Sequence, residues 1–142
     1  MRMLTVYVDI TAPLYWWKEF DTYKVGTVAN SCSTMHKIHA KEFTLDDFSH
    51  EHLFEDALID LGYDINRMNF YRSQFIDTKD KQWWWQMIQR LPSAYNQKRT
   101  VMLNYEVLAN IYKSRKDHRL DEWHDLCHWI ETLPYSQLIT GN

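Results

Sequence analysis

The residues best suited to chemistry lie between Leu91 and Trp123, where amides and cations gather. Asn96 to Thr100 reads NQKRT, and the segment after it carries Asn104, Asn110 and Arg115. Amide and guanidinium groups donate hydrogen bonds to anions, and they suit such a ligand better than a metal ion or a covalent intermediate. We therefore interpret this stretch as one wall of a nucleotide site.

Apolar spacing predicts a helix from about Val101 to Ser114 after a connector over Ser93 to Thr100. At 100° per residue, Asn104 and Arg115 share a face, while Asn110 lies about 120° around from Asn104. Such a helix could touch different ligands or subunits on its two flanks. Alternatively, both asparagines are satisfied core amides and Arg115 is a C-terminal cation favoured by the helix dipole.

Two groups of residues, one near His124 and one near His50, are candidate metal ligands. His124, Cys127 and His128 have the i, i+3, i+4 spacing of one helix face, but no fourth ligand of suitable spacing accompanies them. His50 and His52 stand two residues apart, so on a helix they would point in different directions. We expect no metal, and the sequence contains no Walker loop, GxSxG, HExxH or paired CxxC motif.

Composition bounds the class of protein. With 142 residues and 45% hydrophobic content, we expect a single domain over residues 1–142. A net charge of −3 argues against a dedicated nucleic-acid binder. Neither a membrane-spanning run nor a signal peptide is visible, so we expect a cytoplasmic protein without a membrane partner. Cys32 and Cys127 are expected to be reduced, buried thiols.

Aromatic residues are unusually frequent, with seven Trp, nine Tyr and six Phe. Such surface is often covered by another subunit, so we expect an oligomer, although a Trp-rich monomer core is the alternative. Trp83, Trp84 and Trp85 would cover about 200° of a helix, so at least one should meet solvent or a partner.

The elements that must position these groups follow from periodicity and from turn and cap residues. Leu4 to Ile10 alternates like a strand. Asp21 to Met35 is rich in hydroxyl side chains and is expected to be a loop or an extended segment. Helices are expected from Pro13 to about Phe20 and from Thr44 or Asp46 to a stop at Gly62. Two more are expected over Thr78 to Gln89, with Thr78 as N-cap, and over Leu120 to Leu133 before Pro134. Tyr63 to Ile76 shows no clean hydrophobic period.

The spacing of Leu91-Pro92, Asn104, Asn110 and Arg115 resembles the C-terminal part of the flavin-dependent thymidylate synthases, the ThyX family. In that family the two asparagines belong to the flavin site and the arginine helps to bind dUMP. The resemblance thus implies flavin contacts for Asn104 and Asn110 and a nucleotide contact for Arg115.

The N-terminal layout of strand, short helix and polar segment also resembles ThyX, whose signature is RHRxxSxNxxSxR. Asn30 and Ser33 resemble its NxxS portion, which implies binding roles for both. The chain departs from the signature at Asp21-Thr22-Tyr23, which stands where RHR is expected, and at Met35, which replaces the last arginine. Glu106 also occupies a usual arginine position, and Lys24 is a candidate compensating cation.

The resemblance implies an α+β fold, with a small antiparallel sheet, several helices and a long helix in the core of the oligomer. It further implies a homotetramer with sites between subunits, FAD as a possible cofactor, and, by analogy, a phage or prophage origin. The full set of expected nucleotide-binding residues is Lys24, Asn30, Ser33, Lys98, Arg99, Asn104, Asn110 and Arg115.

Two functions are compatible with this set of residues. The protein either binds or sequesters a phosphorylated nucleotide without methyl transfer, or it is an active enzyme that converts dUMP to dTMP. The lost arginines favour the first, because they are charged ligands of phosphate groups.

Overall fold

The structure is a computed structural model, and it describes residues 1–23, 28–31 and 37–141, with only the backbone of 28–31. The fold is α+β, as predicted, and it divides into two compact units. The first unit contains Met1–Thr11, Trp16–Ser31 and Lys98–Asn142, and the second contains Ala12–Tyr15 and Cys32–Gln97.

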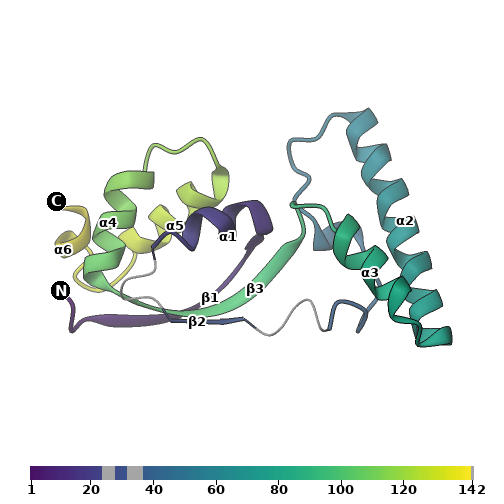
Figure 1. The fold of residues 1–142 in the computed structure, drawn as a ribbon. Helices are drawn as coiled ribbons and strands as arrows, with labels where there is room; N and C mark the ends of the chain where they lie inside the picture. The colour runs from purple at the N-terminus through teal and green to yellow at the C-terminus, as the bar shows by residue number, and fades with distance from the viewer. Residues whose placement is uncertain (24–27, 32–36, 142) are drawn as a thin grey trace. The chain divides into compact units, whose positions relative to one another are not determined.

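Three strands form a small sheet in the order β1-β3-β2 (Figure 1). They are β1 (Thr5–Pro13), β2 (Val28–Ser31) and β3 (Asn96–Asn104). β2 and β3 pair antiparallel, with Val28 opposite Met102 and Ser31 opposite Arg99. The predicted small antiparallel sheet is therefore confirmed, and its first strand continues past Ile10 to Pro13.

The central strand β3 corrects the prediction of a connector followed by a helix from Val101. Val101 and Leu103 are fully buried, while Thr100 is exposed and Met102 is partly covered. This period of two is that of a half-buried strand, and it was hidden by the longer apolar run into which it continues. The helix begins only after Asn104.

Helices cover the sheet of the first unit. They are α1 (Leu14–Phe20), α4 (Tyr105–Arg115), α5 (Asp121–Glu131) and the short α6 (Gln137–Thr140) (Figure 1). The predicted helices at Pro13 to Phe20 and Leu120 to Leu133 are confirmed within a few residues. Trp16 of α1 packs against Trp123 of α5, with ring centroids 4.8 Å apart. Part of the tryptophan content therefore forms a core within the chain.

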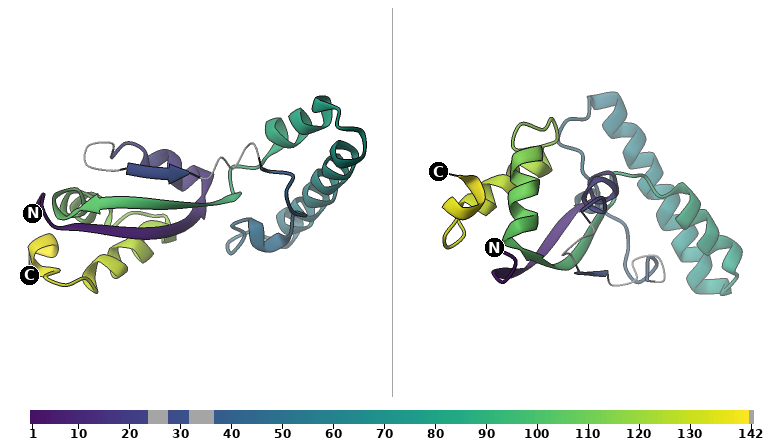
Figure 2. Two further views of the ribbon diagram at one scale, coloured as in Figure 1. Left: turned by 90° about the horizontal axis from the view of Figure 1, so that it is seen from below. Right: turned by 60° about the vertical axis from the view of Figure 1, so that its left-hand side comes forward.

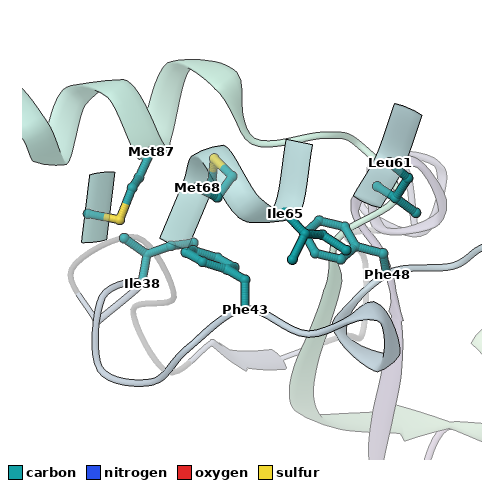
Figure 3. Packing of buried hydrophobic residues seen from close by; sticks show 7 residues of the cluster. All are labelled: Ile38, Phe43, Phe48, Leu61, Ile65, Met68 and Met87. Atoms are coloured by element: carbon teal, nitrogen blue, oxygen red, sulfur yellow. The ribbon is translucent and has the colours of Figure 1, made fainter. Parts of the chain in front are cut away.

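The second unit contains the longest described helix, α2 (Glu55–Thr78), which pairs with α3 (Lys81–Arg90) (Figure 2). A short 3-10 helix, η1 (Leu45–Asp47), precedes them. Their core is a cluster of buried apolar side chains (Figure 3), namely Ile38, Phe43, Phe48, Leu61, Ile65, Met68 and Met87.

The predicted helix stop at Gly62 is wrong, since α2 continues through it to Thr78. A glycine within a helix costs about 1 kcal/mol relative to alanine. Burial of Leu61, Ile65 and Met68 on either side of it outweighs that cost. Packing against the core of the second unit thus explains why this helix does not stop at Gly62.

The boundary between α2 and α3 also differs from the prediction. Thr78 is the last residue of α2, and Lys79 adopts a left-handed conformation with φ of 59°. Asp80 is the N-cap of α3, because its carboxylate accepts from the Gln82 amide at 2.9 Å. The prediction for the three tryptophans is confirmed, since Trp85 is 40% exposed.

Among the described residues, no helix combines the length and the apolar character that a membrane span requires.

Asn69 fastens the segment before η1 to α2. Its Oδ1 accepts from the Phe43 amide at 2.8 Å, and its Nδ2 donates to the Phe43 carbonyl at 2.9 Å. Because Asn69→Ala removes both bonds, we expect it to lower the free energy of unfolding by about 2 kcal/mol in urea titrations. Ser73→Ala, an exposed change on the same helix, is the control and should have little effect. Equal stabilities would contradict this role of Asn69.

Candidate functional site

Arg115, the last residue of α4, is held by three side chains of the first unit. Its Nε donates to the Tyr23 hydroxyl at 2.9 Å, and its Nη1 lies 3.3 Å from Glu19 Oε2. The guanidinium also lies 4.6 Å from the centre of the Trp123 ring, a cation–π contact. With its side chain only 19% exposed, Arg115 has more partners than the helix dipole alone would give it.

Glu19 Oε2 is the acceptor that links this cluster. It accepts from Trp123 Nε1 at 2.9 Å as well as from Arg115, and it lies 3.5 Å from His118 Nε2. The carboxylate therefore occupies the position where an anionic ligand of Arg115 would be expected. A phosphate that binds at Nη1 of this guanidinium competes with Glu19.

Arg99 has a closely similar environment. Its Nη1 donates to Asp21 Oδ1 at 2.8 Å, and its guanidinium lies 4.4 Å from the centre of the Trp17 ring. The side chain is 15% exposed. Each of the two candidate arginines thus lies on a tryptophan and pairs with a carboxylate from α1 or from the turn that follows it.

The remaining candidate cation that the structure describes, Lys98, is more exposed. Its Nζ lies 3.7 Å from Asp9 Oδ2, with 67% of the lysine side chain accessible. An ion pair this exposed contributes little to stability, so Lys98 can exchange its partner for another anion at low cost.

Asn104 lies outside the α4 helix and does not share a helical face with Arg115. It is the N-cap, and its Oδ1 accepts from the Val107 amide at 2.8 Å. Asn110 is exposed on α4, so the alternative that both asparagines are core amides is wrong for Asn110. The side chain of Asn104 is hydrogen-bonded within the chain, as that alternative proposed, but it lies at the start of a helix and not in the core.

Asn30 lies in β2 opposite Thr100, and nothing is described of its side chain. Lys24 and Ser33 lie outside the described residues. The structure thus surrounds one predicted residue, Arg115, with four that the sequence did not identify, namely Glu19, Tyr23, His118 and Trp123. Glu19 is the one acidic residue of the aromatic-rich helix α1, and this is the one sign of its role in the sequence.

The three possible metal ligands on α5 do not form a ligand set. Within the described part of the chain, no group of three His, Cys, Asp or Glu side chains is placed to hold a metal ion. His124 Nε2 instead contacts the His118 carbonyl. Cys127 is buried, and desolvation raises the pKa of its thiol to about 11, which disfavours the metal-binding thiolate.

No protein-family model and no curated protein sequence matches this chain. Solved structures do match its fold. A crystal structure of thymidylate synthase X (ThyX) from Helicobacter pylori with FAD and dUMP superimposes with a TM-score of 0.64 and 14% identity, over 96% of this chain and 70% of that one. A second structure of flavin-dependent ThyX from Helicobacter pylori, complexed with FAD and dUMP, gives a TM-score of 0.66 at 13% identity, with the same coverage. The chain therefore has a ThyX-like fold.

The N-cap role of Asn104 can be tested directly. Asn104→Ala removes the acceptor for the first turn of α4 and should lower the free energy of unfolding by about 1 kcal/mol. Asn104→Asp keeps an acceptor and places a negative charge at the helix N-terminus, so its stability should match or exceed that of the natural chain. Thermal unfolding followed by circular dichroism measures both. Equal losses in the two variants would contradict the cap.

Proposed function

We propose that the protein binds a phosphorylated nucleotide at its ThyX-like site and does not transfer a methyl group. The observation that carries this proposal is the placement of Arg115, partly covered and oriented by Tyr23, Glu19 and Trp123. The two Helicobacter pylori structures of the same fold were solved with dUMP. Their likeness to this chain supports a nucleotide as the ligand.

A guanidinium is well suited to a phosphate because its planar fork donates two parallel hydrogen bonds. The stacking of Arg115 on Trp123 fixes the plane of that fork before a ligand arrives, which reduces the entropy lost on binding. In this proposal the phosphate replaces the carboxylate of Glu19. Binding residues proposed around it are Lys24, Asn30, Ser33, Lys98, Arg99, Asn104 and Asn110.

The acidic residues at expected arginine positions support binding without flavin chemistry. Asp21 pairs with Arg99, and Glu106 pairs with Arg2 on the surface. Carboxylates repel the phosphates of a flavin dinucleotide, and each has an arginine partner that holds it in place. These residues do not fit FAD, so we assign the protein no step that needs a flavin.

The proposal includes a cytoplasmic homo-oligomer, as a tetramer, with nucleotide sites that combine residues from more than one chain. Support comes from the exposed aromatic side chains of the described residues, among them Tyr7 and Tyr63.

Calorimetry with dUMP as the probe tests the binding site. Arg115→Ala should weaken binding by about 1.5 to 3 kcal/mol, the scale of a hydrogen bond to a charged group. Glu19→Gln should strengthen it, because the competing negative charge is lost while the side chain keeps an oxygen for Trp123 Nε1. Arg119→Ala, an exposed change four residues away, is the control. Unchanged affinity in Arg115→Ala, with the fold intact by circular dichroism, would contradict the proposal.

The second candidate, an active flavin-dependent thymidylate synthase, is favoured by one observation, the presence of FAD in both Helicobacter pylori structures. Flavin absorbance distinguishes the two functions. We expect the purified protein to be colourless and to form no dTMP from dUMP with added FAD, a folate carbon donor and a nicotinamide reductant. A yellow protein with near-stoichiometric flavin, or dTMP formation, would establish the enzyme instead.

A further inference from the structure

Helix α2 exposes a stripe of large apolar side chains on the side opposite its buried face. Ile59, Tyr63 and Phe70 are 52%, 69% and 53% exposed. With Asn66 they fall within about 60° of one helix face, counting 100° per residue. We call Ile59, Tyr63, Asn66 and Phe70 the exposed stripe. Large exposed apolar areas on soluble domains commonly mark interaction surfaces.

Two shallow hollows lie along this stripe and meet at Tyr63 and Asn66. One has a volume of about 410 Å³ and is lined by Leu45, Leu58, Ile59, Gly62, Tyr63, Ile65 and Asn66. The other has a volume of about 530 Å³ and is lined by Tyr63, Asn66, Arg67, Phe70 and Tyr71. The surface therefore alternates between projecting rings and recesses, as packed helix faces do.

Gly62 lies in the first hollow, and its lack of a side chain has no explanation within the described chain. A Cβ atom built there meets nothing within 4 Å. The helix would be more stable with alanine at this position. The space beside Gly62 is open and belongs to the first hollow.

We propose that the exposed stripe pairs with the same stripe of a second copy of the chain, antiparallel about a two-fold axis. Centring the axis between Tyr63 and Asn66 places Tyr63 opposite Asn66 of the second copy and Ile59 opposite its Phe70. Each Tyr63 ring then meets the hollow beside Phe70, and each Phe70 ring meets the hollow at Gly62. A two-fold contact of this kind uses one surface twice and closes without further copies.

The charges beside the stripe select this orientation and this occupant. Asp60 and Arg67 are both exposed and lie on the same flank of α2. They are about 10 Å apart along the helix, too far for an ion pair within one chain. In the two-fold arrangement, the same flanks of both copies adjoin, and Asp60 lies within about 3 Å along the axis of the level of Arg67 of the second copy. Two attractive pairs form across the contact, whereas a parallel two-fold arrangement would place these flanks on opposite sides of the contact and would form neither pair.

This pairing names one contact surface of the oligomer that belongs to the proposed function. It uses residues of the second unit only, while Arg115 and the side chains that hold it, Glu19, Tyr23 and Trp123, belong to the first. Loss of the pairing and loss of nucleotide affinity for isolated dUMP are therefore measured separately.

Charge reversal tests the pairing in the full chain. Asp60→Arg and Arg67→Asp each set like charges across the contact, so sedimentation velocity at micromolar concentration should show self-association weakened at least about tenfold. An equimolar mixture of the two variants restores both attractive pairs, and so does the chain carrying both changes. Association in the mixture and in the double variant should return to that of the natural chain.

Asp117→Arg, an exposed change in the first unit with the same change of charge, is the control and should leave association unaffected. Circular dichroism checks that each variant is folded, and calorimetry with dUMP reports the nucleotide site in parallel. A monomeric natural chain would overturn the proposal. Single reversals that leave association unchanged, or a mixture that fails to recover it, would also overturn it.

Discussion

The carboxylate of Glu19 is the interaction on which the candidate site depends. One oxygen accepts from Trp123 and Arg115 and lies near His118, so it joins α1 to the end of α4 and to α5. A half-buried arginine without a partner would be costly, and the carboxylate removes that cost. An anion that binds at Nη1 of Arg115 must therefore compete with a charge that the chain itself provides.

Family resemblance singled out Arg115 but could not supply its surroundings. Its partners Glu19 and Tyr23 are more than ninety positions away in the sequence, and no periodicity connects them. Asp21, which looked like a simple loss of a phosphate ligand, turns out to be the partner of Arg99. The acidic residue that replaces an expected arginine therefore forms an ion pair with Arg99. The sequence alone does not show that these two residues are in contact.

Local patterns predicted the elements well where a strong period coincided with clear end signals. α5, which ends shortly before Pro134, is of this kind, and β1 was also found, although it continues three residues past its predicted end at Ile10. The errors occur where tertiary packing overrides local preference. Gly62 carries a helix-breaking signal, yet α2 crosses it because the flanking residues are buried, and β3 was assigned to a helix because its alternation runs directly into the apolar face of α4. Asn104 stands at that junction, so its role as a cap was missed with it.

We propose a nucleotide site at Arg115 and an oligomer that carries out no flavin chemistry. Native mass spectrometry of the full chain with added dUMP tests both parts together. We expect a multimer that retains one dUMP per chain and contains no mass corresponding to FAD. A ligand-free monomer, or a multimer with stoichiometric FAD, would contradict it.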